Sequence, residues 1–387
     1  MISAFIVLIV TTLLAQVMIK AYQDRFRHST ATFTWVYVFH LLLFLVYYTY
    51  AAFNSSDSRQ YYRSITGATD DLNWIDYYGV GTSFIEFMAF PFVEYLGLSY
   101  EAMMLLFSFF GFVGFIYFYL VIIEHTTYRH KLFGVDFIAL MLFLPNMHFW
   151  TVSLGKGSVM FLGLGLFFYG LSRVGSRLLP LLIGGLIVYH VRSHIMLVIV
   201  AGTLMASLFS SKGIKTWQKI GLMAIGTAVF IPIMTTFLTY AGLEEADAKS
   251  LGDWQEHRSS ELGKATSGVN LNSYSQPMRI FTFLFRPLFV DAPNAMGLVV
   301  SIENLFYLTL FIRCLSPGFV RFIATSPWLI KIALISFIGV SIALAQVTAN
   351  TGIAIRQKAQ VMYLFFLVFI TYADYTYSTK RKLVIGE

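Results

Sequence analysis

Hydrophobic residues along this chain gather in long runs that are separated by short polar segments. Eleven runs come near or exceed the roughly 20 residues that a helix needs to cross a bilayer. They lie at 2–19, 32–53, 101–123, 135–152, 158–172, 177–191, 194–210, 219–241, 296–312, 327–346 and 358–375. The pattern predicts an all-α polytopic integral membrane protein with about eleven transmembrane helices, several of them short.

The stretch 84–98 is also apolar, but Pro91 interrupts it and Glu86 and Glu94 lie within it. Irregular backbone is tolerated at membrane depth only where protein buries it or where it lines a wet cavity. We therefore expect a re-entrant or interfacial segment that does not cross the membrane. With the polar residues before it, this segment makes a first long loop at 54–98.

A second long polar segment covers 242–295. It opens with three acidic residues, Glu244, Glu245 and Asp247. The pattern up to Lys264 predicts an amphipathic surface helix, and the chain beyond it is irregular. A loop of this length in a compact membrane protein is usually a lid or a binding loop. We expect one membrane domain over 1–387, with this segment as its lid.

The composition supports a membrane protein and excludes several classes of site. Hydrophobic residues make up 57% of the chain and charged residues only 12%, about half the charged share of a soluble domain. The single cysteine, Cys314, excludes an internal disulfide and a cysteine-based metal site. The first apolar run has neither a basic region before it nor a small-residue cleavage site, so we interpret it as a retained transmembrane helix.

The distribution of lysine and arginine predicts the orientation. The loops at 20–31, 124–134, 172–177, 211–219 and 313–331, with the tail from Lys380, hold sixteen of the 27 basic residues. The opposite short loops hold six. We expect the N-terminus outside and the C-terminus in the cytoplasm, with both long loops extracytoplasmic. The net charge of +7 is then a sign of membrane orientation, and a nucleic acid is not expected as a partner.

This topology places five short charged motifs on the extracytoplasmic face. They are Asp57-Ser58-Arg59, Gly155-Lys156-Gly157, Arg192-Ser193-His194, Phe285-Arg286-Pro287 and Ile355-Arg356-Gln357. A charge near a bilayer is costly unless it is paired or wet, so such residues are candidates for function. Because cationic groups outnumber acids, the motifs together predict a site for an anion, most simply a phosphate or a pyrophosphate.

Each motif also has a structural interpretation, and the sequence leaves both open. Asp57 suits a general base on a sugar hydroxyl or a metal ligand, or it is a solvated loop residue that pairs with Arg59. Lys156 lies in a tight turn where backbone can approach a ligand and where Ser158 suits a cap of the next helix. The alternative for Lys156 is a lysine that extends from a helix end to the interface.

The remaining motifs have the same two interpretations. Arg192 and His194 either bind phosphate or anchor the turn at the interface, whereas His148 and His190 suit hydrogen bonds within the bundle. Arg356 and Gln357 of the fifth motif are candidates as well, and so is Arg279, which lies outside the five motifs. Arg279 and Arg286 are seven residues apart and share a face if the segment is helical. The alternatives are structural pairs, of Arg286 with Asp291 and of Arg356 with Glu303 or Asp291.

The same residues resemble the Wzy-type and EpsG-like polymerases of O-antigen and exopolysaccharide assembly, which are related to membrane glycosyltransferases of the GT-C kind. The resemblance rests on Asp57 to Tyr62, Gly81 to Ile85, Pro145 to Lys156, Phe285 to Leu288 and Ile355 to Lys358. It covers nearly the full length. Relatives often have an acidic residue where this chain has Gly157, and proline where it has Ser193.

The resemblance implies an enzyme of the bacterial inner membrane that transfers glycan from a polyprenyl-diphosphate carrier to a sugar hydroxyl. It implies that Asp57 is the general base and that Arg279 and Arg286 stabilise the leaving diphosphate. Lys156, Arg192, His194, Arg356, Gln357 and Arg59 would bind substrate. No cofactor is implied. Membrane lipid and other proteins of polysaccharide assembly, such as a chain-length regulator, are the implied partners.

Three other functions remain open at this stage. A GT-C enzyme that adds one sugar from a polyprenyl-phosphate donor would use Asp57 with Asp70 or Asp71 and a divalent metal. A lipid-linked glycan transporter or flippase would place ionisable residues deep inside helices, where the sequence offers mainly Glu303. An acyltransferase would need a histidine within a helix as its base, for which His190 is the fair candidate.

Overall fold

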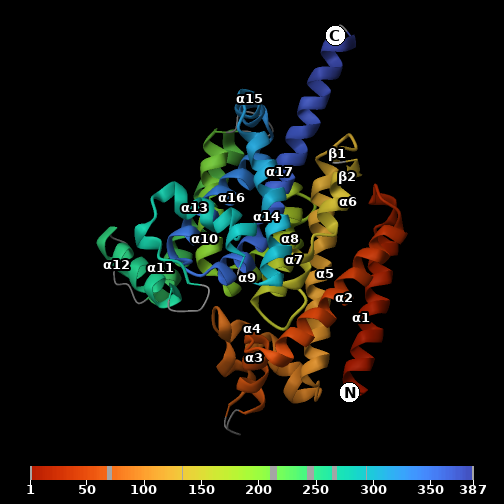
Figure 1. Ribbon diagram of the computed structural model, residues 1–387, viewed down its shortest axis with the longest axis vertical. Helices are drawn as coiled ribbons and strands as arrows, with labels where there is room; N and C mark the ends of the chain where they lie inside the picture. Colours follow the sequence, from red (N-terminus) through yellow and green to blue (C-terminus); the bar gives the residue numbers. More distant parts are fainter. Residues whose placement is uncertain are drawn as a thin grey trace. The chain divides into compact units, whose positions relative to one another are not determined.

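The computed structural model describes residues 2–67, 72–132, 134–209, 216–241, 248–263, 268–292 and 294–385. The chain divides into two compact units, Met1–Ser193 and His194–Glu387. Both units are built of helices, and the strands among the described residues form one small two-stranded antiparallel sheet (Figure 1). The fold class is therefore all-α.

Unit 1 contains the following elements. They are α1 (Ile2–Ala21), η1 (Gln23–Arg25), α2 (Thr30–Phe53), α3 (Asp57–Thr66), η2 (Trp74–Tyr77), α4 (Thr82–Phe90), η3 (Pro91–Tyr95), α5 (Tyr100–Glu124), β1 (Lys131–Leu132), β2 (Val135–Asp136), α6 (Phe137–Leu142), α7 (Pro145–Phe149), α8 (Lys156–Ser172) and α9 (Leu178–Val191).

Unit 2 follows with α10 (Ser193–Phe209), α11 (Thr216–Ala241), α12 (Ala248–Gly263), η4 (Leu271–Ser273), α13 (Gln276–Phe285), η5 (Phe289–Asp291), α14 (Ala295–Cys314), α15 (Pro317–Thr325), α16 (Trp328–Val347) and α17 (Thr351–Ile385).

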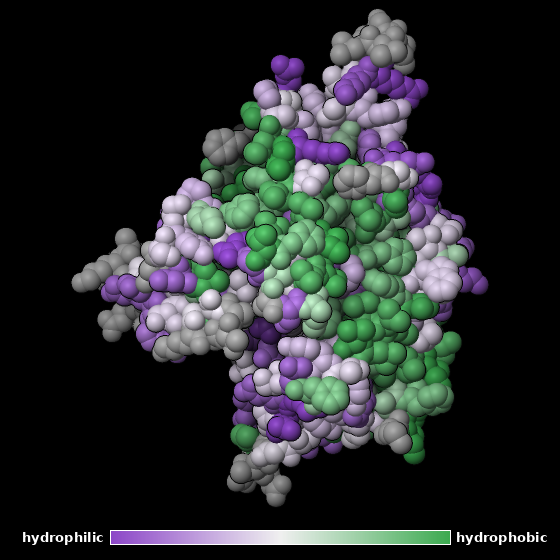
Figure 2. All heavy atoms as spheres, in the orientation of Figure 1, coloured by the Kyte–Doolittle hydropathy of each residue, from purple (hydrophilic) through white to green (hydrophobic). Residues whose placement is uncertain are grey.

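Six of the helices in the described part of the chain are long and apolar enough to cross a membrane: α1, α2, α5, α14, α16 and α17. Figure 2 shows hydrophobic side chains gathered over α1, where Ile2, Phe5 and Val17 are among the exposed residues. Exposed apolar side chains along a long helix indicate contact with lipid. The protein is therefore an all-α membrane protein, and the total of eleven spans stays a prediction.

The eleven apolar runs all coincide with helices, but several boundaries differ from those expected. The run 135–152 is split into α6 and α7, because Pro145 begins a new helix at its first turn. The loop expected at 313–331 contains α15, a helix that begins at Pro317 with Ser316 as its N-cap. The last helix begins at Thr351 rather than 358, because the side chain of Asn350 accepts a hydrogen bond from the Ile353 amide at 3.1 Å.

The residues after α2 were expected in a loop, and the structure instead begins a helix, α3, at Asp57. An acidic residue in the first turn is favoured by the positive end of the helix dipole. Ser58, Tyr61 and Ile65 are buried on one face, at the spacing of an amphipathic helix. The segment 84–98 is interrupted at Pro91 as expected, where α4 gives way to the π-helical turn η3.

Glycines allow the helices of unit 1 to approach closely. α8 packs against both α5 and α9, and a Cβ atom added at Gly184 of α9 would lie 2.4 Å from the backbone nitrogen of Phe167. Small residues at such contacts are typical of helix pairs in membranes, where packing replaces the hydrophobic effect. The close packing fixes the ends of α8 and α9, which carry Lys156 and Arg192.

In unit 2, α16 and α17 pack together, and α13 packs against α14, α16 and α17. The rings of Phe337 and Phe365 stack in this core with centroids 5.1 Å apart. α12, the helix of the predicted lid, packs on α16. The expected surface helix of the second long loop is thus present at Ala248–Gly263, and it lies beside the elements that carry Arg279 and Arg286.

Candidate functional site

Arg286 is the C-cap residue that follows α13, and Pro287 comes directly after it. Its Nε donates to Oδ2 of Asp291, and its Nη1 donates to the hydroxyl of Tyr274 at 3.0 Å. Burial opposes the charged form, but the bonds to Asp291 and Tyr274 outweigh it and raise the pKa of Arg286. The structural pair with Asp291 is therefore present. The Arg286 side chain is 22% exposed.

Two buried side chains hold the backbone around Arg286. The amine of Lys358, which is fully buried in α17, donates to the carbonyls of Leu284 at 3.3 Å and Arg286 at 3.0 Å. The side-chain amide of Asn304 in α14 donates to the carbonyl of Pro287 at 2.6 Å. Carbonyls at a helix end lack helical partners and need others when they are buried. Lys358 and Asn304 are thus positioning residues for Arg286.

Arg279 lies one turn into α13 and takes part in a second network. Its Nη1 donates to Oε1 of Gln346 at 3.2 Å, and its Nε donates to the carbonyl of Tyr274 at 3.3 Å. Gln255 of α12 also donates to Oε1 of Gln346, at 3.3 Å, and Gln346 donates to Gln276 at 2.6 Å. Tyr274 therefore joins the two arginines, through its carbonyl to Arg279 and through its hydroxyl to Arg286.

A cavity of about 410 Å³ opens beside this network. It is lined by Gly252, Gln255, Glu256, Ser259, Arg279 and Gln346. The lining supplies amide, hydroxyl and carboxylate groups together with one guanidinium, which is the chemistry that sugar hydroxyls and a phosphate require. The predicted lid thus contributes α12 to a polar cavity that also contains Arg279.

Arg356 and Gln357 lie in the second turn of α17 and not in the loop before it. Gln357 accepts a hydrogen bond from the hydroxyl of Thr348 at 2.8 Å, and Arg356 is half-buried. The turn between α16 and α17 also pairs with the chain after α12, since the Val269 amide donates to the carbonyl of Ala349 at 2.8 Å. The structure therefore links this motif to the lid segment within unit 2.

Unit 1 gathers the other motifs around the first long loop. Asp57 opens α3 and is exposed, whereas Arg59 is half-buried. Lys156 opens α8, and a Cβ atom added at Gly155 would lie 3.4 Å from the ring of Tyr61. Ser158 does not cap α8, because its hydroxyl donates to the carbonyls of Ser153 at 2.9 Å and Gly155 at 3.1 Å.

The Arg192-Ser193-His194 motif lies where the two units join in the sequence. Arg192 is buried at the end of α9 in unit 1, and His194 begins unit 2. The backbone carbonyl of His190 accepts a hydrogen bond from the Gly81 amide at 2.6 Å. The Nε2 atom of the His190 ring lies 2.9 Å from the hydroxyl of Tyr78. The first loop therefore contacts the end of α9, and the expectation that His190 is hydrogen-bonded within the bundle is confirmed.

His148 is also hydrogen-bonded within the bundle, as expected. Its Nδ1 lies 2.8 Å from Nδ1 of His40, and its Nε2 lies 2.8 Å from the carbonyl oxygen of Leu142. Both histidines are fully buried. Their contacts join α2 to α7, and α7 to Leu142 at the end of α6.

Several expected carboxylates lie outside the described residues. These are Asp70 and Asp71 of the first loop and Glu244, Glu245 and Asp247 of the second, together with Lys264. Over the described ranges, no group of three or more His, Cys, Asp and Glu side chains is suited to hold a metal ion. The arrangement of unit 2 suits an anion next to a hydroxyl-rich group.

Sequence reasoning missed Tyr274, Asn304, Gln346 and Glu256, none of which lies in one of the five charged motifs. Asn304 and Gln346 carry one signal, since each is the single side-chain amide of a long, mainly apolar helix. Such a residue usually needs a partner inside the protein. Comparison with known proteins adds no assignment, because no family model, no curated protein and no solved structure matches the chain.

Proposed function

We propose that the protein is a membrane glycosyltransferase of surface polysaccharide assembly, of the Wzy-type and EpsG-like kind. It transfers or polymerises oligosaccharide units from a polyprenyl-diphosphate carrier to a sugar hydroxyl at the extracytoplasmic face of the bacterial inner membrane. The N-terminus is outside and the C-terminus is cytoplasmic. Other proteins of polysaccharide assembly, such as a chain-length regulator, are its partners.

One observation carries this proposal: Arg279 and Arg286 share Tyr274 as a hydrogen-bond partner, and Arg279 lines a polar cavity. The Arg286 side chain is 22% exposed, and the cavity that Arg279 lines offers amides, a hydroxyl and a carboxylate. A diphosphate suits guanidinium groups because each can donate two parallel hydrogen bonds to it. The neighbouring glycan suits Gln255, Gln346 and Ser259 because each can hydrogen-bond to a sugar hydroxyl.

The reaction that these groups support is a displacement at the anomeric carbon. The acceptor hydroxyl oxygen forms a bond to that carbon, while the bond between the carbon and the diphosphate oxygen breaks. The departing electron pair stays on the diphosphate, where Arg279 and Arg286 stabilise the added charge. The hydroxyl proton passes to a carboxylate, and Glu256 lines the same cavity as Arg279.

The proposal is tested by analysing lipid-linked glycans from cells that carry the wild type, Arg286→Ala or Arg321→Ala. Arg321 is exposed on α15 and serves as the matched control. We expect Arg286→Ala to accumulate complete repeat units on diphosphate carriers and to lose long polymer, with Arg321→Ala unchanged. Accumulation of incomplete repeats would instead indicate a GT-C enzyme that adds one sugar.

A transporter of lipid-linked glycans is the second candidate, and one observation favours it. Lys358 and Glu303 are both buried inside long apolar helices, and Glu303 accepts a hydrogen bond from Tyr307 at 2.7 Å. Ionisable residues at such depth occur on transport pathways. Against this, the amine of Lys358 bonds to the backbone that holds Arg286. Complete repeat units that stay on the cytoplasmic face in Arg286→Ala, with the extracytoplasmic carrier pool depleted, would favour the transporter.

A further inference from the structure

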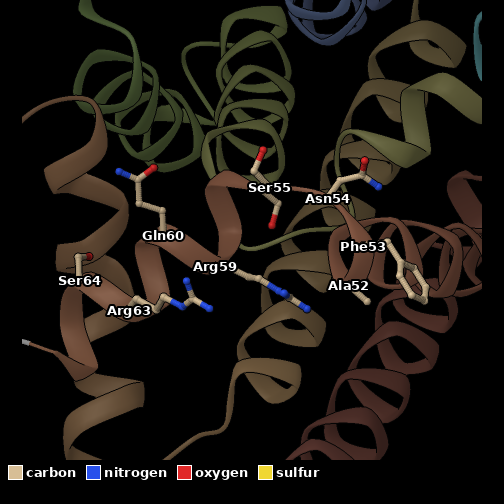
Figure 3. Close-up of a pocket in the computed structure, with 9 residues that line it drawn as sticks. Ala52, Phe53, Asn54, Ser55, Arg59, Gln60, Arg63 and Ser64 are labelled. Carbon is tan, nitrogen blue, oxygen red and sulfur yellow. The ribbon is translucent and has the colours of Figure 1, made fainter.

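A second polar cavity, of about 640 Å³, lies within unit 1 between the end of α2 and the face of α3. Its polar lining comes from Asn54, Ser55, Gln60 and Ser64 and from two arginines, Arg59 and Arg63. Figure 3 shows both arginine side chains extending from α3 in a similar direction, with Asn54 and Ser55 where the chain passes from α2 to α3. The cavity therefore combines two cations with neutral hydrogen-bonding groups.

The two guanidinium groups are available to a ligand. Arg59 and Arg63 are four residues apart on α3, so they lie on one face of the helix. Among the described residues, neither side chain has a hydrogen bond or an ion pair with an acid. Ser64 of the lining donates a hydrogen bond to the carboxylate of Glu86 at 2.5 Å, so one acid adjoins the two arginines. The polar lining is thus positive.

The other wall of the cavity is the end of a membrane-spanning helix. Ala52 and Phe53 line the cavity and are the last residues of α2, one of the six long apolar helices. Phe53 is 85% exposed, and Leu42, Leu45 and Val46 on the same helix are also exposed. The boundary between hydrocarbon and water lies where such a helix ends. The cavity therefore adjoins a surface that suits acyl chains.

From this juxtaposition we infer that the cavity binds the phosphate of a membrane lipid headgroup. Arg59 and Arg63 hold the phosphate oxygens, and Asn54 and Gln60 supply further hydrogen bonds. The lipid chains lie along the exposed apolar residues of α2. All residues of this cavity belong to unit 1, whereas the proposed glycosyltransferase site belongs to unit 2, so the inference is independent of that activity.

The test is native mass spectrometry of the purified full chain, released from detergent with dioleoyl phosphatidic acid as the probe. Dioleoylglycerol has the same chains without the phosphate and is the matched control lipid. We expect the double variant Arg59→Gln, Arg63→Gln to bind phosphatidic acid roughly tenfold or more weakly than the wild type. Arg321→Gln, on an exposed arginine of α15, is expected to bind like the wild type.

A second variant, Arg59→Lys with Arg63→Lys, keeps the charge and loses the paired hydrogen bonds, so we expect binding between the two extremes. The inference is overturned if the glutamine variant binds phosphatidic acid as the wild type does, or if dioleoylglycerol binds equally well. Displacement of the lipid by millimolar inorganic phosphate would assign the site to free phosphate and overturn the choice of a lipid. Thermal melting of each variant establishes that it is folded.

Discussion

The amine of Lys358 lies 2.6 Å from Oδ1 of Asn304, although the two residues are on different helices and both are fully buried. The same amine bonds to the carbonyls of Leu284 and Arg286, and Asn304 bonds to the carbonyl of Pro287. These two side chains together satisfy the backbone where α13 breaks. The position of the Arg286 guanidinium therefore depends on a lysine 72 residues away in the sequence.

Lys358→Met should lower both stability and activity. The substitution removes a charged donor and leaves the oxygen of Asn304 and two carbonyls without their partner, at a cost of about 2 kcal/mol. We expect the free energy of unfolding, measured in mixed detergent, to fall by this amount. Lys380→Met, on an exposed lysine near the end of α17, is the control and should leave the unfolding curve in place. Equal curves for both variants would remove Lys358 from its positioning role.

The cavity of unit 2 gives a prediction about substrate recognition. Arg279→Ala and Glu256→Gln should each reduce polymer formation by about tenfold or more, because one loses a phosphate donor and the other a proton acceptor. Polymer length and amount on gels report the effect. Asp253→Asn changes another exposed carboxylate of α12 that does not line the cavity. A matching loss in Asp253→Asn would mean that α12 acts only through its overall charge.

Gly157 has a packing role that the Gly155-Lys156-Gly157 motif does not reveal. A Cβ atom added at Gly157 would lie 2.1 Å from the carbonyl oxygen of Trp150, which is backbone and cannot move aside cheaply. We expect Gly157→Ala to destabilise the protein by about 1–3 kcal/mol. Gly221→Ala, where nothing lies within 4 Å of the added atom, should be neutral or slightly stabilising. Thermal melting of the two variants compares them directly.

Arg177 and Arg173 both lie close to Glu124, so they allow the cost of losing a buried arginine to be compared with that of losing an exposed one. Arg177 is buried, donates two hydrogen bonds to Glu124 at 2.7 and 2.8 Å, and lies over the ring of Tyr169. Arg173 is 61% exposed and lies 3.7 Å from the same carboxylate. We expect Arg177→Ala to cost about 3 kcal/mol, since it removes both hydrogen bonds from a largely buried carboxylate and leaves it only the exposed Arg173.

Arg173→Ala should cost at most about 1 kcal/mol, because water screens an exposed pair. Chemical unfolding of both variants in the same detergent measures the difference. Similar costs for the two substitutions would show that the Arg177 pair is solvated in the membrane protein.

Much of the helical framework can be predicted from the sequence, because long apolar runs leave a membrane-spanning helix as the only structure that satisfies its own backbone. The predicted run at 101–123 corresponds to α5 at Tyr100–Glu124, and the run at 327–346 corresponds to α16 at Trp328–Val347. The sequence pattern did not predict α3, because the buried face of this helix consists of only Ser58, Tyr61 and Ile65 within a polar segment.

The site was harder to predict than the framework. Charged motifs pointed to Arg279 and Arg286, and the structure joins them within unit 2. It could not be foreseen that Tyr274 links them or that Asn304 holds the break after Arg286, because these contacts depend on how α13, α14 and α17 pack. No local pattern encodes the packing of helices that are distant in the sequence.

The central claim is that the protein extends polysaccharide from a lipid diphosphate carrier. The most direct measurement is mass analysis of polyprenyl-linked glycans extracted from cells with and without this chain. The account predicts that cells without it accumulate one complete repeat unit on the diphosphate carrier and lack long polymer, and that the wild type restores the polymer while Arg286→Ala does not. An unchanged carrier pool and normal polymer in cells without the chain would contradict it.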